Sequence, residues 1–384
     1  MTALAARLEQ GFWQAFEAGP SLTTMAPGRV NLIGEHTDYN DGWVMPLAIG
    51  CGTMVAARPR ADRQLRIAAL DLDAKCTIDL TQPIVPAPHG DWSNYPRGVA
   101  AAAMARGLDF AGADIAITGN VPQGAGLSSS ASFEVALALA LATLAGHPDH
   151  DRTDLALIGQ SAEHHFAGCQ CGIMDQLVSA RAEVGAALLI DCRSLATRSV
   201  PLPADAAVLI VHSGVRRGLV EGEYNARRQQ CEAAAATLGV MALRDASLDL
   251  LLAHQGQMPD ETFCRARHVI TENARTLAAA EALEAGDMAR LGPLMAQSHA
   301  SMRDDFAITT PELDTLADLM GSELGSAGGA RMTGGGFGGA AIAIASRQRI
   351  MALATKVGET YRTPDGTAPQ IMVETATAGA HVVG

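Results

Sequence analysis

The sequence predicts an α+β fold in two domains. The chain has 384 residues, enough for two domains, and its 48% hydrophobic and 18% charged content is typical of a globular protein with a large core. Short β-like runs alternate with helical stretches in the first half, whereas the second half is mainly helical and then contains a glycine-rich segment and an apolar run. This order of elements leaves a mixed α/β fold open as the alternative.

The individual elements follow from hydrophobic periodicity. Residues 1–19 have an apolar face interrupted by Arg7, Glu9 and Glu17, which predicts a surface helix and not a signal peptide. The expected strands span residues 52–57, 65–69, 115–118, 187–190, 207–212 and 340–345. The expected helices span residues 96–108, 130–146, 153–168, 221–238, 260–286, 287–302 and 311–322. The longest apolar run, residues 135–146, is too short to cross a membrane and indicates a buried helix.

Charge and cysteine content restrict the classes of partner. A net charge of −13 argues against nucleic acid or an anionic membrane, because both would require a basic face. Seven cysteines, an odd number spread along the chain, indicate reduced thiols and not a disulfide framework. Cys169 and Cys171 are close in sequence but lack a second nearby Cys or His pair, so the spacing predicts no zinc site. We therefore expect a cytoplasmic protein.

Residues 26–40 concentrate hydrogen-bonding side chains among small and apolar residues. These side chains are Arg29, Asn31, Glu35, His36 and Asp38. Such a group is costly to bury and more specific than a surface loop requires. It predicts a polar-ligand site, in which carboxylates and imidazole bind hydroxyls and the guanidinium binds an anion. A helix-capping loop whose charges pair with one another is the alternative.

Residues 121–132 read Val-Pro-Gln-Gly-Ala-Gly-Leu-Ser-Ser-Ser-Ala-Ser, and they lie between an expected strand and an apolar helix. Glycines let the backbone approach an anion, and the helix N-terminus presents unpaired N–H groups. Simple helix capping needs only one serine, so the three serines favour a phosphate site and offer a ligand for Mg²⁺. The segment lacks the Gly-Lys-Ser/Thr ending of a Walker A loop.

A second glycine-rich segment, residues 334–339, satisfies the pattern G-x-G-x-x-G of dinucleotide-binding dehydrogenases. That fingerprint requires a helix after the glycines, whereas residues 340–345 predict a strand. We therefore expect a tight turn into a strand, and the dehydrogenase interpretation fails on its context.

The run from Gly28 to Tyr39 closely resembles, without a gap, the signature segment of galactokinases. These belong to a family of small-molecule kinases, the GHMP kinases, with homoserine, mevalonate and phosphomevalonate kinases. Residues 121–132 resemble the family's nucleotide-binding motif, and residues 331–339 resemble its third motif, a loop near the phosphates and sugar. The resemblance covers residues 20–345, with Ala340 where galactokinases often have Cys. It implies a two-domain GHMP-kinase-like fold, with residues 1–198 and 199–384 as the domains and the active site in the cleft between them.

The resemblance also implies the reaction, which is ATP-dependent phosphorylation of the C1 hydroxyl of galactose by a monomer that uses Mg²⁺. Asp175 would approach the anomeric hydroxyl, with Arg29 near both this carboxylate and the γ-phosphate, while Ser130 and Glu163 would hold Mg²⁺. By its own sequence context, a lone aspartate such as Asp175 is more often a helix N-cap than a catalytic residue. The implied sugar-binding residues are Glu35, His36, Asp38, Gly172 and Tyr224. The implied nucleotide-binding residues are Trp92, Gly124, Ala125, Gly126, Leu127, Ser128, Ser129 and Ser130.

Two alternatives to this reaction remain at the level of sequence. A related sugar 1-kinase for N-acetylgalactosamine or arabinose would share all three motifs and differ in the pocket around C2 or C5. A non-catalytic sugar sensor on the same fold is the second alternative. The intact serine run and the presence of Asp175 argue against the sensor.

Overall fold

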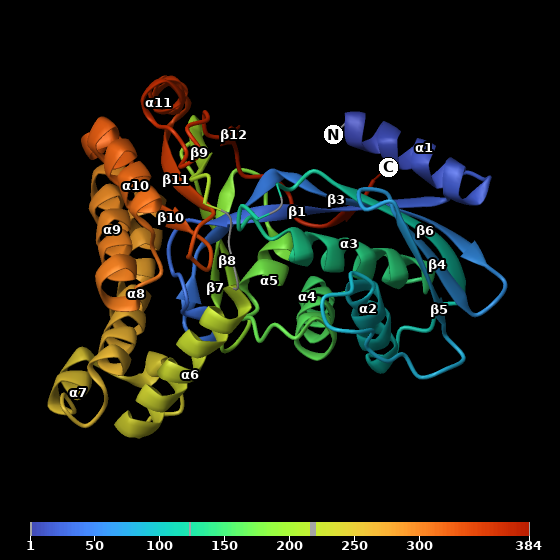
Figure 1. The fold of residues 1–384 in the computed structure, drawn as a ribbon, viewed down its shortest axis with the longest axis horizontal. Coiled ribbons are helices and arrows are strands. Elements are labelled where there is room, and N and C mark those ends of the chain that lie inside the picture. The colour runs from blue at the N-terminus through green and yellow to red at the C-terminus, as the bar shows by residue number, and fades with distance from the viewer. Residues whose placement is uncertain (1, 123, 216–219, 384) are drawn as a thin grey trace.

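The computed structural model describes residues 2–122, 124–215 and 220–383. Two predictions touch residues outside these ranges, namely the first residue of the N-terminal helix and Gln123 in the first glycine-rich segment. Within the described residues the strands form three sheets, with helices packed against them on both sides (Figure 1). The predicted α+β fold is confirmed.

The largest sheet belongs mainly to the first half of the chain. In spatial order its strands are β13 (His381–Val382), β1 (Leu22–Asn31), β3 (Pro46–Arg60), β6 (Gly112–Gly119), β4 (Gln64–Ala69) and β5 (Ala74–Asp79). Helix α1 (Thr2–Phe16) covers one face through Leu4, Leu8 and Phe12, which pack with Met25 and Met54. On the other face lie α2 (Asn94–Ala105), α3 (Ser129–Leu144), α4 (Arg152–Ala162) and α5 (Met174–Arg181), as Figure 1 shows.

The second half of the chain forms a four-stranded sheet and the helices around it, whereas the strands of a three-stranded sheet come from residues 43–201. One sheet has the order β10 (Gly329–Thr333), β11 (Ala340–Ser346), β9 (Ala206–His212) and β12 (Ile371–Glu374), and the other consists of β2 (Trp43–Val44), β7 (Ala186–Asp191) and β8 (Thr197–Pro201). The accompanying helices are α6 (Val220–Leu238), α7 (Leu248–Ala253), α8 (Asp260–Glu284), α9 (Met288–Ser301), α10 (Pro311–Leu324) and α11 (Arg347–Thr360). Short turns of 3₁₀ helix are η1 (Asp38–Asn40), η3 (Leu243–Asp245) and η5 (Gly325–Ala327), and turns of π helix are η2 (Glu163–Ala167) and η4 (Met302–Phe306).

A shared core joins the halves at the ends of β1 and β10. Leu32 and Leu47 from the first half pack there with Ile210 and Ile342 from the second. At the same place the Asn31 N–H donates to Thr333 Oγ1 at 2.9 Å, and Thr333 Oγ1 donates to the Asn31 carbonyl at 3.1 Å. The signature segment and the loop after β10 are therefore held side by side.

Every expected helix and strand is present, with ends that differ by a few residues. The strand predicted at residues 52–57 is only part of the much longer β3, and the helix predicted at 153–168 becomes a π turn after Ala162. The segment 334–339 connects β10 to β11, which confirms the predicted turn into a strand. The expected domain boundary after residue 198 falls inside β8. Strand β13, near the end of the chain, pairs with β1 of the first half. The division into two domains therefore stays a prediction.

Strand β1 was not predicted, because Pro27 and Gly28 interrupt its pattern. The structure has a register shift between Pro27 and Arg29, where a proline and a glycine fit without breaking the pairing with β3. A Cβ on Gly28 would lie 2.6 Å from the Leu127 carbonyl oxygen, so glycine permits the phosphate-loop candidate to pack on β1. Strands β5, β8, β10, β12 and helices α5 and α11 were also not predicted.

Two further observations bear on the classes considered above. Among the described residues, no helix combines the length and apolarity needed to span a bilayer. All seven cysteines carry free thiols.

Candidate active site

Two cavities of the described chain meet at Tyr95 and Ser130, which line both of them. The first, which we call the aromatic cavity, has a volume of about 460 Å³ and is walled by Trp92, Tyr95 and Phe133. The second, the polar cavity, has a volume of about 250 Å³ and is lined by charged and polar side chains. All nine residues predicted for a sugar, a metal and catalysis line the polar cavity: Arg29, Glu35, His36, Asp38, Ser130, Glu163, Gly172, Asp175 and Tyr224.

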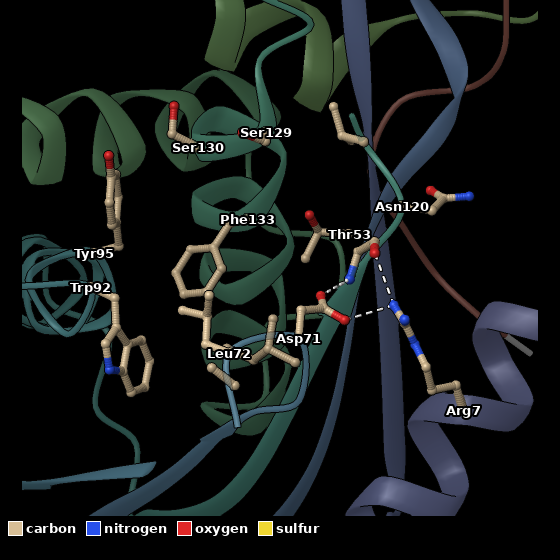
Figure 2. Close-up of a pocket in the computed structure, with 14 residues that line it drawn as sticks. Arg7, Thr53, Asp71, Leu72, Trp92, Tyr95, Asn120, Ser129, Ser130 and Phe133 are labelled. Atoms are coloured by element: carbon tan, nitrogen blue, oxygen red, sulfur yellow. Dashed lines mark hydrogen bonds and ion pairs between the residues drawn. The ribbon is translucent and has the colours of Figure 1, made fainter. Parts of the chain in front are cut away.

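Figure 2 shows the aromatic cavity between an aromatic wall and a polar wall. Of the predicted nucleotide-binding residues, Trp92, Ser129 and Ser130 line it. On the opposite side Asp71 is fixed by an ion pair with Arg7 at 2.7 Å and by the Gly119 N–H at 2.7 Å.

The sequence did not reveal Asp71, Tyr95, Asn120 and Phe133 as members of this cavity. Tyr95 stands close to Trp92 in sequence, and this spacing is a signal that was available. Asp71 and Asn120 follow β4 and β6, and because these strands are parallel, their carboxyl ends share one edge of the sheet. Only the pairing of the strands shows that these two residues are neighbours.

The loop before α3 turns sharply and carries three left-handed residues, Gly124, Gly126 and Ser128, with φ of 73°, 74° and 61°. Its carbonyl groups hold Arg29, whose Nη1 donates to Gly126 O at 2.6 Å and whose backbone N–H donates to Leu127 O at 3.1 Å. The side chains of Ala125 and Leu127 are buried in the shared core. The loop residues 124–128 do not line either cavity in the described structure, so their contact with phosphates through the backbone stays a prediction.

Arg29 and Asp175 form a bidentate ion pair at the floor of the polar cavity. Arg29 Nε donates to Asp175 Oδ1 and Nη2 donates to Oδ2, both at 2.7 Å, and Ser128 Oγ also donates to Oδ2. The Arg29 side chain is 5% exposed and that of Asp175 is 30% exposed, so a ligand in the cavity can reach the carboxylate. Asp175 is not the N-cap of α5, because Ile173 occupies that position. The N-cap alternative is therefore wrong.

Glu35 and His36 are anchored by the loop after β10. Glu35 Oε1 accepts from the Gly334 N–H at 2.7 Å and lies 3.3 Å from Nη2 of the fully buried Arg331. Burial raises the pKa of Glu35, while the positive charges of Arg331 and Arg29 act in the opposite direction. These contacts contradict the alternative of a capping loop whose charges pair only among themselves.

His36 adopts a left-handed backbone with φ of 61°. Its Nδ1 lies 2.7 Å from the Tyr39 hydroxyl and its Nε2 lies 3.3 Å from the Gly335 carbonyl oxygen. The ring packs against Tyr224, with centroids 5.1 Å apart. Tyr224 comes from α6, so the second half of the chain supplies one wall of the polar cavity.

Side chains of helix α8 form hydrogen bonds to the backbone of residues 34 and 35. Glu272 Oε1 accepts from the Gly34 N–H at 3.0 Å, and His268 Nε2 donates to the Glu35 carbonyl at 3.1 Å. Burial raises the pKa of Glu272, but the positive charge of Arg275 and further contacts lower it to about 2, so it stays ionised. Sequence reasoning missed these hydrogen bonds, because a glutamate and a histidine in a long helix carry no local signal.

Asp38 faces Asp175 and Gly172. Burial, and next the charge of Asp175, raise the pKa of Asp38 to about 7, although the Tyr39 N–H donates to it at 3.0 Å. A Cβ on Gly172 would overlap the Asp38 carboxylate. Glycine is therefore the residue that leaves room for Asp38 in the cavity wall.

The comparisons with known proteins agree with this geometry. Residues 10–59 match the family described as galactokinase galactose-binding signature, residues 94–183 match the GHMP kinases N terminal domain, and residues 279–363 match the GHMP kinases C terminal family. These segments contain the anchored carboxylates, the serine loop with Asp175, and the loop after β10.

Solved structures extend the match to nearly the whole chain. The chain is 32% identical to Lactococcus lactis galactokinase, solved with galactose, over 98% of this chain and 99% of that one, with a TM-score of 0.91. Mevalonate kinase of Methanococcus jannaschii is 17% identical over 93% and 98% of the two chains, with a TM-score of 0.66, and homoserine kinase of Cytophaga hutchinsonii is 15% identical over 94% and 97%, with a TM-score of 0.63. The last two share the fold. Since both the signature and an almost full-length relative agree, the chain belongs to the galactokinase family of GHMP kinases.

Proposed function

We propose that this protein transfers the γ-phosphoryl group of ATP to the C1 hydroxyl of galactose. One observation carries the proposal: the Asp175 carboxylate, fixed by the Arg29 guanidinium, faces a polar cavity that shares Tyr95 and Ser130 with an aromatic cavity. An adenine ring stacks well on aromatic side chains, and a sugar needs acceptors for its hydroxyls. The shared residues mark the point where a γ-phosphate and a sugar hydroxyl would meet.

In this proposal Asp175 orients the C1 hydroxyl toward the phosphate. Its Oδ2 already accepts from Arg29 and Ser128. Among the described residues Oδ1 accepts only from Arg29, so it has the greater remaining capacity for a substrate hydroxyl. Phosphoryl transfer depends mainly on positioning and charge neutralisation, since its loose transition state needs little early deprotonation. Arg29 would stabilise charge on the transferring group from the side of the loop before α3.

The side chains at the meeting point suit Mg²⁺. Mg²⁺ prefers oxygen ligands and usually takes one or two from the protein, with phosphates and water completing its shell. The Ser130 hydroxyl and the Glu163 carboxylate are such donors, and both line the polar cavity. We assign them as the protein ligands of a Mg²⁺ ion that neutralises phosphate charge. Because the protein carries a net charge of −13, it depends on such local cations to bind ATP.

Glu35, His36 and Asp38 would read the sugar hydroxyls, with Tyr224 and Gly172 completing the wall. The Oε1 atom of Glu35 already contacts Gly334 and Arg331, which fixes the orientation of the carboxylate.

We infer that the protein acts as a monomer in the cytoplasm.

The direct test is the release of ADP from MgATP with galactose, glucose, N-acetylgalactosamine or arabinose. We expect kcat/KM for galactose to exceed that for its 4-epimer glucose by roughly tenfold to a hundredfold per lost contact, because an unpaired buried polar group costs about 1–3 kcal/mol. Equal values for galactose and glucose, or a preference for either of the other two sugars, would overturn the assignment of substrate. Tight sugar binding with no ADP release would indicate a sensor.

The pKa of about 7 at Asp38 predicts pH-dependent binding of galactose. If the ionised carboxylate accepts from the sugar, lowering the pH from 8 to 6 reduces the ionised fraction about tenfold and raises the Kd by a similar factor. Calorimetric titration of galactose over this range measures the effect. Asp38→Asn is the matched control, since its amide does not titrate and its pH profile should be flatter than that of wild type. If the galactose Kd changes with pH by the same factor in both proteins, Asp38 is not the group whose ionisation controls binding.

The contact between Gly172 and Asp38 predicts the effect of one added methyl group. In Gly172→Ala the new Cβ would displace the Asp38 carboxylate, so we expect the Kd of galactose to rise by roughly tenfold or more, as for the loss of one buried polar contact. The Kd of MgATP should change little. Gly321→Ala is the control, because a Cβ there meets no described atom within 4 Å outside the neighbouring residues and backbone of its own helix. Unchanged galactose binding in Gly172→Ala would contradict the assigned position of Asp38.

A further inference from the structure

A cluster of sulfur and oxygen ligands lies at the edge of the polar cavity. One carboxylate oxygen of Glu163 and the Sγ atoms of Cys169 and Cys171 all lie within 4.8 Å of one another. Glu163 is buried and both cysteines are half-buried, and all three line the polar cavity. Ligand atoms around a tetrahedral Zn²⁺ ion are about 3.5–4 Å apart, so small rotations of these side chains suffice to bind one. The cysteine spacing alone predicted no zinc site, because the third ligand comes from the preceding π turn.

The backbone holds these three residues together in advance. Glu163 begins the π turn η2, and its carbonyl accepts from the N–H groups of Gly168 at 2.8 Å and Cys169 at 3.1 Å. His164 Nε2 lies 2.8 Å from the Cys171 carbonyl oxygen. The chain is thus folded back on itself from 163 to 171, and a cation would bind without ordering a new loop.

A buried carboxyl group, that of Glu134, lies behind the cluster and has one oxygen atom without a hydrogen-bond partner among the described residues. Glu134 of α3 has no exposed surface, and its Oε2 accepts from Gln176 Nε2 at 3.1 Å, but its Oε1 has no hydrogen-bond partner among the described residues. The same Gln176 Nε2 lies 4.0 Å from Cys171 Sγ, so Glu134 connects to the cluster through one amide. Glu134 also interacts electrostatically with Glu163 and Cys169. A divalent cation between these groups would give the buried carboxyl groups an electrostatic partner.

We propose that Glu163, Cys169 and Cys171 bind a thiophilic divalent cation, with Zn²⁺ as the expected ion, and that its binding inhibits phosphoryl transfer. Soft thiolate ligands select Zn²⁺ over Mg²⁺, and three protein ligands leave a fourth position open toward the cavity. Each thiol that forms a bond to Zn²⁺ releases its proton to the solvent. Inhibition follows because Glu163 then binds Zn²⁺ instead of Mg²⁺. The inhibition rests on the proposed function, whereas the binding of Zn²⁺ does not.

The binding part is tested on the full chain, reduced with a phosphine and stripped of metal by a chelator. Zn²⁺ is titrated in competition with a chromophoric zinc indicator, and Co²⁺ is added separately to look for a thiolate-to-metal charge-transfer band. We expect one Zn²⁺ per chain, and a loss of affinity of roughly tenfold or more in Cys169→Ser and in Cys171→Ser. Cys264→Ser, on α8 in the other half, is the matched control and should behave as wild type. Equal affinity in all four proteins, or no thiolate band, would overturn the site.

The inhibition part is tested by measuring ADP release at fixed MgATP and galactose while Zn²⁺ is increased. We expect half-inhibition of Cys169→Ser to need roughly tenfold more Zn²⁺ than wild type, each protein being compared with its own uninhibited rate. Addition of EDTA should restore activity. If only a reductant restores it, a Cys169–Cys171 disulfide is responsible and the metal proposal is wrong. If Zn²⁺ binds but does not inhibit, the inhibition part is wrong and the binding part stands. If no sugar supports ADP release, the proposed function is wrong, and the binding test still decides whether the Zn²⁺ site exists.

Discussion

The bidentate contact between Arg29 and Asp175 ties together three parts of the chain that are far apart in sequence. Arg29 lies in β1 and Asp175 lies in the first turn of α5. The remaining guanidinium nitrogen of Arg29, Nη1, donates to the carbonyl oxygen of Gly126 in the loop before α3. Because a guanidinium is planar and its donors are fixed in a fork, this contact sets both the distance and the orientation of the carboxylate. The position of Asp175 relative to the loop before α3 is therefore determined by one side chain.

The rest of the site keeps this contact in place with buried polar groups and close backbone approaches. Gly28 allows the loop before α3 to lie against β1, and Gly172 allows Asp38 to face Asp175. Glu272 and His268 of α8 hold the backbone of residues 34 and 35, while Arg331 and Gly334 hold the Glu35 carboxylate. Breaking a buried ion pair by removing one partner typically costs about 3–5 kcal/mol, so this network gives a rigid cavity as long as it is complete. Rigid support of this kind is what a reaction that depends on positioning requires.

Much of the fold and of the site could be predicted from sequence, because the relevant signals are local. Helices such as α3 and α8 show their periodicity. Residues 28–39 and 124–132 form continuous motifs, and six of their residues line the two cavities: Arg29, Glu35, His36, Asp38, Ser129 and Ser130. Strand β1 was missed because its proline and glycine resemble a break, although they sit at a bulge. The meeting of Asp71 and Asn120 in one cavity and the contacts from α8 to residues 34 and 35 depend on strand order and helix packing. No single segment of sequence contains that information.

A double-mutant cycle on Arg29 and Asp175 tests most directly whether their contact controls catalysis. The measurement is kcat with saturating MgATP and galactose for wild type, Arg29→Lys, Asp175→Asn and the double variant, with the galactose Kd of each from calorimetry. Lysine keeps the charge but not the fork, and asparagine keeps the shape but not the charge. We predict that each single variant lowers kcat by roughly 10² to 10⁴ with little change in galactose Kd, and that the double variant is no slower than the slower single variant, because both changes remove the same interaction. Losses that multiply in the double variant, or near-wild-type turnover of Asp175→Asn, would contradict the account.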